Sequence, residues 1–147
     1  MTTLVSPDIE AYAQAHSMAE SAAARALREE TQRTMEYARM MVGPLEGAFL
    51  KMMAQLVGAT RVLEIGMFTG YSALCFAEAL PDHGRVVTCE IDEASAAFGR
   101  RHLAASPHGT KIDIRVGPAL ETLRELTGPF DVIFIDLMFS PKTKCAV

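Results

Sequence analysis

The chain has 147 residues, half of them hydrophobic and 22% charged, which is the size and composition of a single globular domain with one buried core. Its formal net charge of -4 argues against a surface for nucleic acid or for an anionic membrane, since both require clustered lysine and arginine. No apolar run approaches the roughly 20 residues of a membrane-spanning helix, no signal peptide is visible, and three widely spaced cysteines predict neither a disulfide framework nor a zinc site. We therefore expect a soluble, cytoplasmic chain with free thiols.

The N-terminal part of the chain is expected to be helical. Residues 17–39 are rich in alanine, glutamate, arginine and methionine, and Ser17 and Glu20 have the spacing of a capping box, so a helix is predicted to begin there. Because its apolar stripe consists mostly of alanines, we expect this helix to lie across a surface rather than inside a core. Gly43 ends the pattern, and residues 1–43 are predicted to form a helical cap.

A second helix is predicted to start at Pro44 and to run through Leu56, because proline suits the first helical turn. Its methionines are flexible residues that fill irregular gaps, so they are expected in a core rather than at a cofactor. The apolar residues that recur at helical spacing, and are expected to face that core, are Leu45, Phe49, Met52, Met53 and Leu56.

After Gly58 the sequence alternates between short apolar runs and helical stretches. The apolar runs are Arg61–Met67, Val86–Ile91, Ile112–Val116 and Asp131–Ile135. The helical stretches between them are Tyr71–Leu80, Ala94–Ala105 and Ala119–Leu126. Strands that alternate with helices form parallel sheets, and apolar runs such as VLEI and VIFI are typical of strands covered on both faces. The predicted fold class is α/β, with a parallel sheet of about four strands and flanking helices.

In such a sheet, ligands bind outside the carboxyl ends of the strands, so the residues that leave each strand are the candidates for a site. The predicted strands deliver the following residues to this edge: Glu64, Gly66, Gly70 and Ser72 from the first, Glu90 and Asp92 from the second, Gly117 and Ala119 from the third, and Asp136 from the fourth. Asp92 is interpreted more simply as the N-cap of the next helix. The four histidines have no ligand-like spacing.

The loop after the first strand indicates which ligand fits. A dinucleotide-binding loop has the pattern G-x-G-x-x-G, whose second glycine lets the backbone approach a pyrophosphate. Here the glycines are Gly66 and Gly70, and Phe68 stands where that second glycine would be. The lysine and serine or threonine that end a phosphate-binding P-loop are also lacking. Ligands that carry phosphate are therefore disfavoured.

Glu90 stands at the end of the second strand, where a carboxylate accepts hydrogen bonds from ribose hydroxyls. This acid, the acidic first strand and the lack of a phosphate loop together point to S-adenosylmethionine (SAM), whose positive sulfonium and ammonium groups suit a carboxylate-rich edge. Taken singly, the two glycines could serve only as turn residues, Ser72 as a helix start and Glu90 as a solvated carboxylate.

Four motifs in order resemble those of the class I SAM-dependent O-methyltransferases, in the branch of the caffeoyl-CoA and catechol O-methyltransferases: RVLEIGMFTGYSAL, VVTCEID, VGPALETL and PFDVIFID. The segment MMVGPLEGAFLKMM resembles the stretch before the first strand in that family. The resemblance implies a Rossmann-like SAM-methyltransferase fold, with the SAM-binding α/β domain over residues 44–136. It also implies methyl transfer from SAM to a small aromatic, catechol-like hydroxyl, assisted by Mg²⁺ or another divalent cation.

The resemblance assigns cofactor contacts to these positions: Val42, Glu64, Gly66, Met67, Ser72, Glu90, Ala119 and Asp136. Val42 would contact the methionine part of SAM, and the next four would line that part and the adjoining ribose. Glu90 would hold the ribose hydroxyls, and Ala119 would lie at the adenine. Asp136 would lie near the cofactor and ligate the metal, which in such enzymes fixes the acceptor oxygen in line with the sulfonium methyl.

The sequence departs from the family pattern after Asp136. Where the family has an acidic and lysine-bearing segment, this chain has Leu137, Met138 and Phe139. Residues 137–147 are therefore interpreted as a divergent tail, and the last strands of the family, with an Asp-Asn pair for the metal, are expected to be missing. The fourth strand would then be an apolar edge, open to pairing with another chain. The family also often forms dimers.

Two alternatives to an active methyltransferase remain. Because the residues for metal and acceptor are largely lacking from the sequence, the chain could be a truncated, non-catalytic module that binds SAM or a partner. A nicotinamide-dependent dehydrogenase is the alternative from another enzyme class, and Phe68 argues against it.

Overall fold

The computed structural model describes residues 5–137 and shows four strands, β1 (Arg61–Ile65), β2 (Arg85–Glu90), β3 (Ile112–Val116) and β4 (Val132–Ile135). All neighbouring strands are parallel and lie in the order β3-β2-β1-β4, which confirms the predicted α/β sheet. Within the described residues β4 pairs with β1 alone, as expected of an edge strand. Apart from Leu137, the tail predicted at residues 137–147 lies outside the described residues.

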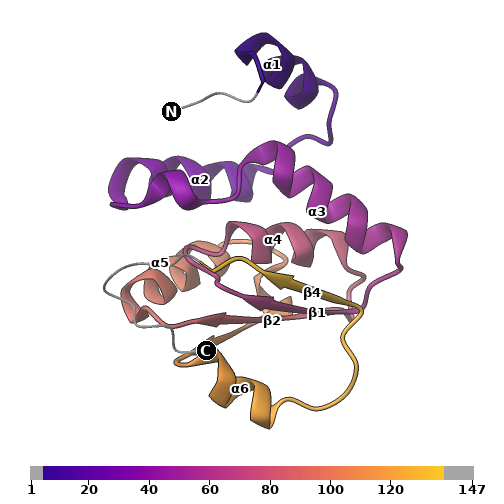
Figure 1. Cartoon of the computed structure of the whole chain (residues 1–147), viewed down its shortest axis with the longest axis vertical. Helices are drawn as coiled ribbons and strands as arrows, with labels where there is room; N and C mark the ends of the chain where they lie inside the picture. The colour runs from indigo at the N-terminus through magenta and orange to yellow at the C-terminus, as the bar shows by residue number, and fades with distance from the viewer. Residues whose placement is uncertain (1–4, 138–147) are drawn as a thin grey trace.

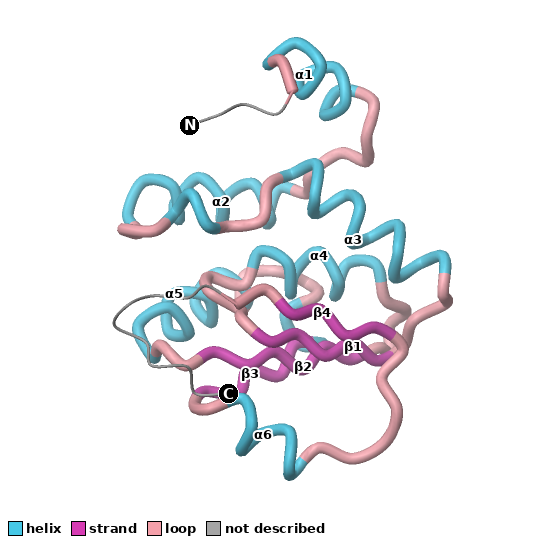
Figure 2. The backbone as a smooth tube through the Cα atoms, viewed as in Figure 1, coloured by secondary structure: helices cyan, strands magenta, loops and turns pink. Residues whose placement is uncertain are grey.

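Helices cover the two faces of the sheet unequally (Figure 1). On one face lie α4 (Tyr71–Ala79) and α5 (Glu93–Leu103), with α2 (Ala22–Thr34) and α3 (Pro44–Leu56) as a second layer above them. On the other face lies α6 (Ala119–Glu125), as the backbone trace also shows (Figure 2). The other helical elements are α1 (Pro7–Ala15) and the short 3-10 helices η1 (Ala38–Met40) and η2 (Gly109–Lys111). The described part of the chain holds no helix with the length and apolar character to cross a bilayer.

The larger core lies between the sheet and α4. Val62 of β1, Val86 of β2 and Phe76 of α4 are fully buried there. Phe134 of β4 packs edge-on against Phe76, with ring centroids 5.8 Å apart. Successive residues of a strand point to opposite faces of the sheet. The residues of β1 and β2 that alternate with Val62 and Val86 therefore form a smaller cluster on the α6 side: Leu63, Ile65, Val87 and Cys89.

The N-terminal helices differ from the sequence-based expectation at their ends. A helix at Pro7–Ala15 was not predicted, although Ser6 caps it and proline occupies its first turn. The predicted capping box at Ser17 and Glu20 is wrong, because α2 begins at Ala22 with Ser21 as its cap. The Ser17 hydroxyl instead donates to the carbonyl oxygen of Ala13 at 2.6 Å, which continues the end of the preceding helix.

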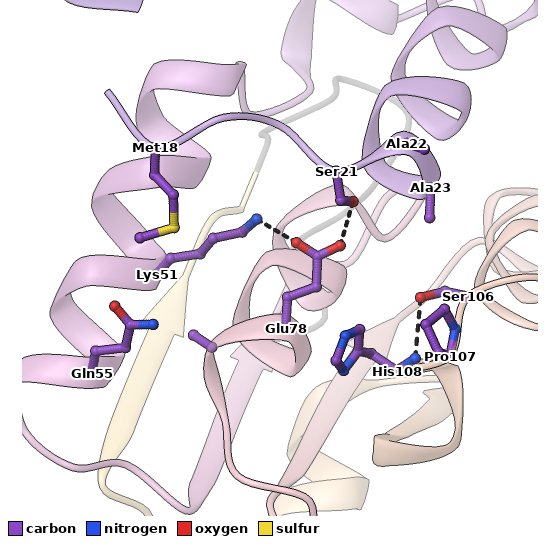
Figure 3. A pocket seen from close by; sticks show the side chains of 11 residues that line it. Met18, Ser21, Ala22, Ala23, Lys51, Gln55, Glu78, Ser106, Pro107 and His108 are labelled. Atoms are coloured by element: carbon purple, nitrogen blue, oxygen red, sulfur yellow. Dashed lines mark hydrogen bonds and ion pairs between the residues drawn. The ribbon is translucent and has the colours of Figure 1, made fainter. Parts of the chain in front are cut away.

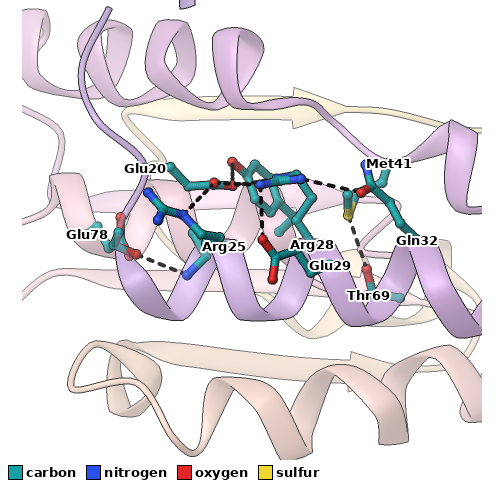
Figure 4. Close-up of polar contacts among 11 residues, drawn as sticks. Glu20, Arg25, Arg28, Glu29, Gln32, Met41, Thr69 and Glu78 are labelled. Atoms are coloured by element: carbon teal, nitrogen blue, oxygen red, sulfur yellow. Dashed lines mark hydrogen bonds and ion pairs between the residues drawn. The ribbon is translucent and has the colours of Figure 1, made fainter. Parts of the chain in front are cut away.

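Glu20 does not cap a helix because two distant groups hold its carboxylate. Arg28 donates to the Glu20 carboxylate from Nε and Nη2 at 2.8 and 3.0 Å, which is a bidentate ion pair (Figure 4). The Tyr71 hydroxyl, at the start of α4, donates to Glu20 Oε1 at 2.8 Å. Glu20 thus ties the N-terminal layer to the helix that follows β1.

The expectation that this helix, now seen as α2, lies across the surface holds only in part: more than half of its residues are exposed, but one stripe is buried. Ala24, Leu27 and Thr31 form a fully buried stripe along it. The small alanine allows close packing, and the Thr31 hydroxyl donates to Thr69 Oγ1 at 3.0 Å inside the protein. The alanine-rich stripe of α2 is therefore a buried face, although it contains few large apolar residues.

The bounds predicted for α3 are right, but the face predicted to be buried is wrong. Its buried residues are Gly47, Leu50, Lys51 and Ala54. The large apolar residues expected in the core point outward, and Phe49 and Leu56 are 52% and 72% exposed. The reason is steric, since a Cβ on Gly47 would lie 2.8 Å from Cys75 Sγ, so α3 approaches α4 through its small residues.

Candidate cofactor site at the carboxyl edge of the sheet

The loop between β1 and α4 turns sharply at the carboxyl edge. Gly66, Phe68 and Gly70 have φ angles of 100°, 50° and 90°, all in the left-handed region. Glycine adopts these values freely, whereas phenylalanine does so at an energetic cost. The N–H groups of Gly66 and Met67 both donate to the carbonyl oxygen of Cys89, at 3.0 and 3.1 Å. These hydrogen bonds fix the loop against the end of β2.

Glu90, the last residue of β2, lies beside this loop. Its Oε2 accepts a hydrogen bond from the N–H of Phe68 at 2.6 Å, and its Oε1 accepts one from the N–H of Asp92 at 2.9 Å. Asp92 caps α5, as predicted, because its Oδ2 accepts from the N–H of Ser95 at 2.8 Å. The half-buried Glu90 carboxylate is therefore oriented by backbone donors, while each oxygen keeps a lone pair for a ligand.

Glu64 is a fully buried carboxyl group near the carboxyl end of β1. Its Oε2 accepts a hydrogen bond from the Thr88 hydroxyl at 2.5 Å, whereas its Oε1 has no partner among the described residues. Burial raises the pKa of Glu64 to about 7, the Ser72 and Thr88 hydroxyls lower it by less, and the charges of Asp136 and Glu90 raise it further. A buried carboxyl oxygen without a partner is costly, so this atom marks a place where a donor or a cation would be favourable.

Asp136 follows β4 and lies directly against the β1–α4 loop. A Cβ on Gly66 would come within 2.0 Å of the carbonyl oxygen of Asp136, so a residue larger than glycine does not fit there. The N–H of Asp136 donates to the carbonyl oxygen of Ile65 at 2.9 Å, and its side chain is exposed. Burial, and then the charge of Asp136, raise the pKa of Glu46 in the first turn of α3. Sequence reasoning did not single out Glu46, although an acid close after Val42 was a usable signal.

Val42 lies just before α3 and is 5% exposed. The Sδ atom of its neighbour Met41 accepts a weak hydrogen bond from the Thr69 hydroxyl at 3.9 Å. This contact places the start of α3 beside the β1–α4 loop, while Val42 itself packs in the larger core.

The other predicted site residues lie along the same edge. Met67 in the β1–α4 loop and Ser72 in the first turn of α4 are 2% and 4% exposed. Ala119 begins α6 beyond the end of β3, and the N–H of Gly117 before it donates to the carbonyl oxygen of Glu90 at 2.9 Å. The loops after β1, β2 and β3 are therefore connected by hydrogen bonds that meet at the end of β2.

The acids at this edge suit a cationic organic ligand better than a metal ion. The charges of Asp136 and Glu90 both act on Glu64, so three carboxyl groups lie near one another at this edge. A hard cation such as Mg²⁺ requires several converging oxygen ligands. Residues 5–137 contain no group of three or more acidic, histidine or cysteine side chains placed to hold a metal. The described side chains thus fit the charge of SAM and do not by themselves fit a divalent cation.

A cavity of about 430 Å³ lies among the helices, away from this edge (Figure 3). Lys51 of α3 and Glu78 of α4 form a buried ion pair in it, and the Ser21 hydroxyl donates to Glu78 Oε1 at 2.5 Å. These groups satisfy one another, so nothing in the cavity requires a ligand. We interpret the ion pair as a link that joins α2, α3 and α4.

Comparison with known proteins identifies the family. The sequence profile of the O-methyltransferases matches residues 14–140. The chain belongs to this family. A catechol O-methyltransferase of Niastella koreensis is 39% identical over 107 residues, covering 70% of this chain and 48% of that protein. Catechol O-methyltransferase domain-containing protein 1 of Mus musculus is 41% identical over 130 residues, covering 85% of this chain and 49% of that protein. This O-methyltransferase chain spans about half the length of these relatives.

Solved structures confirm the Rossmann-like methyltransferase fold. A methyltransferase of Podospora anserina bound to S-adenosylhomocysteine (SAH) matches with a TM-score of 0.84 and 29% identity, covering 93% of this chain and 61% of that chain. The O-methyltransferase TomG of Streptomyces achromogenes, in complex with SAM, matches with a TM-score of 0.82 and 32% identity, covering 88% of this chain and 60% of that chain. This O-methyltransferase chain therefore has the fold on which those proteins bind SAM or its product.

Proposed function

We propose that this chain binds SAM at the carboxyl edge of its sheet and takes part in methyl transfer to a small aromatic hydroxyl. The observation that carries the proposal is the buried Glu64 Oε1, which has no hydrogen-bond partner among residues 5–137 and lies near other acids. A positively charged ligand would offset the cost of that unpaired oxygen. The SAM and SAH found in similar structures support this choice of ligand.

In this proposal Glu90 binds the ribose hydroxyls, because its oxygens retain acceptor capacity beside two backbone donors. Ala119 lies at the adenine. The methionine part is held by residues of the β1–α4 loop and its neighbours: Val42, Glu64, Gly66, Met67, Ser72 and Asp136. When bound, SAM supplies an electrophilic methyl group on a positive sulfur. The residues of this chain would contribute mainly by fixing its orientation.

The acceptor is proposed from the names of the relatives, which include catechol and caffeoyl-CoA O-methyltransferases. Metal assistance is left out of the proposal, because the exposed Asp136 belongs to no described group of three or more side chains placed to hold a metal. The described cysteines, Cys75 and Cys89, are free and buried, which supports the proposed cytoplasmic location.

One observation favours a second candidate, a module that binds SAM without turnover. Residues 5–137 hold no group of three or more acidic, histidine or cysteine side chains placed to bind the metal that such turnover would use. The two candidates share the cofactor site and differ only in methyl transfer. Pairing with another chain through β4 would belong to this second candidate.

Calorimetric titration of the purified chain with SAH tests the cofactor site, which both candidate functions require. We expect binding that weakens at least tenfold in Glu90→Ala, because a charge-assisted hydrogen bond is lost. Glu125→Ala, which removes an exposed carboxylate at the far end of α6, is the matched control and should bind as the wild type does. Absence of SAH binding by a folded wild-type chain would refute the proposal. Transfer of a labelled methyl group from SAM to catechol then separates the enzyme from the module.

A further inference from the structure

We propose that Phe68 is a positioning residue: its backbone N–H, held in a left-handed conformation, orients the Glu90 carboxylate toward the cofactor ribose. The inference rests on the proposed SAM site. It concerns the main chain of Phe68 rather than its ring.

The hydrogen bonds of the loop supply the first argument. Three consecutive N–H groups, of Gly66, Met67 and Phe68, all point to the end of β2. The first two bind the carbonyl oxygen of Cys89, and the third binds the Glu90 side chain at 2.6 Å. The direction of the Phe68 N–H is therefore set by the same turn that fixes its neighbours to the strand.

The φ angle of Phe68 supplies the second argument. Among the described non-glycine residues, Phe68 is the one with a positive φ, at 50°. Such a conformation is disfavoured for a bulky residue and persists only where its surroundings impose it. Here they do, because Gly70 N–H donates to the Met67 carbonyl oxygen at 2.9 Å and closes a tight turn around Phe68. A negative φ at Phe68 would redirect the chain that follows it and break the Gly70–Met67 hydrogen bond, so the turn that presents the Phe68 N–H to Glu90 would not close.

The hydrogen bond from Phe68 also leaves part of the Glu90 carboxylate free to bind a ligand. The N–H groups of Phe68 and Asp92 each occupy a different oxygen of Glu90, so the carboxylate is fixed in its plane. Each oxygen keeps a lone pair, and two adjacent hydroxyls of a ribose are a matching pair of donors. A carboxylate fixed in this way loses less rotamer entropy when it binds the sugar.

Two substitutions separate the main chain of Phe68 from its ring. Phe68→Asn removes the ring but tolerates the left-handed conformation, whereas Phe68→Val keeps an apolar side chain and disfavours that conformation. The readout is the preference for SAH over its 2′-deoxyribose counterpart, measured as the ratio of the two dissociation constants. We expect a wild-type ratio of about ten, from the loss of one charge-assisted hydrogen bond.

We expect Phe68→Asn to keep this ratio and Phe68→Val to lower it toward one. In a Glu90→Ala background, Phe68→Val should leave the ratio unchanged, because the two residues act on the same contact. Equal ratios in the two Phe68 variants would overturn the inference. A wild-type ratio of one would also overturn it while leaving SAM binding intact, whereas no binding of either compound would refute the proposed function and the inference together.

Amide exchange of the wild-type Phe68 N–H provides a second measurement that does not depend on the folding of a Phe68 variant. It should be slow, and it should become faster in Glu90→Ala while the Gly66 and Met67 amides stay protected. An unchanged Phe68 amide in that variant would contradict the inference.

Discussion

The two faces of the sheet differ in how fully they are covered. On the α4 face, Val62 and Val86 are completely buried under two layers of helices. On the α6 face, Leu63 and Val87 of the inner strands are buried, but Ile133 and Ile135 of the edge strand β4 are 58% and 61% exposed. The two β4 residues are β-branched and apolar, as Val62 and Val86 are, so their sequence does not distinguish them. An apolar strand sequence therefore shows which residues can be buried. Whether they are buried depends on the helices and neighbouring strands that pack against them.

The same comparison bears on the cofactor site. Glu64 points to the covered face, because it alternates with Leu63 and Ile65, which lie in the α6-side cluster. Its carboxyl group is therefore enclosed by the well-packed half of the protein. The candidate site depends on the covered face for its rigidity, and we expect substitutions on that face to have the largest effects.

The largest effect is expected on the covered face. Phe76→Ala would remove a fully buried ring that packs against Phe134, and should lower the free energy of unfolding by about 4 kcal/mol. Urea unfolding followed by circular dichroism measures this loss. A loss under about 1 kcal/mol would mean that the α4 side is not a packed core.

A pH-dependent effect of intermediate size is expected from Glu64. Because its pKa is raised to about 7 in the folded chain from an ordinary value of 4.5, the folded state binds the proton more tightly. The stabilisation is therefore complete below about pH 4.5 and is lost as the pH rises through 7, by about 3 kcal/mol in total. Unfolding measured across this range for wild type and Glu64→Gln should show the difference between them falling by that amount. A constant difference would contradict the burial of the Glu64 carboxyl.

The smallest effect is expected on the open face. Ile135→Thr keeps a β-branched side chain and should change the free energy of unfolding by only about 0.5 kcal/mol, because most of Ile135 is already exposed. Chemical unfolding at two protein concentrations measures it. A loss above about 2 kcal/mol, or one that depends on concentration, would show that a second chain covers this face in solution.

The sheet was predictable from sequence because each strand is a short apolar run bounded by turn residues. The faces of α2 and α3 were not, because these helices pack closely at the small residues Ala24 and Gly47, and their other buried residues follow from that contact. The capping box failed for a related reason. The Glu20 carboxylate is bound by Arg28 and Tyr71, and such long-range partners cannot be read from local spacing.

For the candidate site, the glycines of the β1–α4 loop and the acids at the strand ends could be placed in advance. The positive φ of Phe68 could not, because propensity argues against it and only the hydrogen bonds of the folded loop impose it. The unpaired oxygen of Glu64 also emerges only from packing. Whether the predicted residues contact SAM stays a prediction.

Hydrogen–deuterium exchange of the chain, measured with and without SAH, is the direct test of a cofactor site at the carboxyl edge of the sheet. We predict that SAH slows exchange in the loops at residues 66–70, 90–92 and 117–119, and leaves β4 and the cavity around Lys51 unchanged. Protection confined to that cavity, or no protection at saturating SAH, would contradict the assignment of a cofactor site to the carboxyl edge of the sheet.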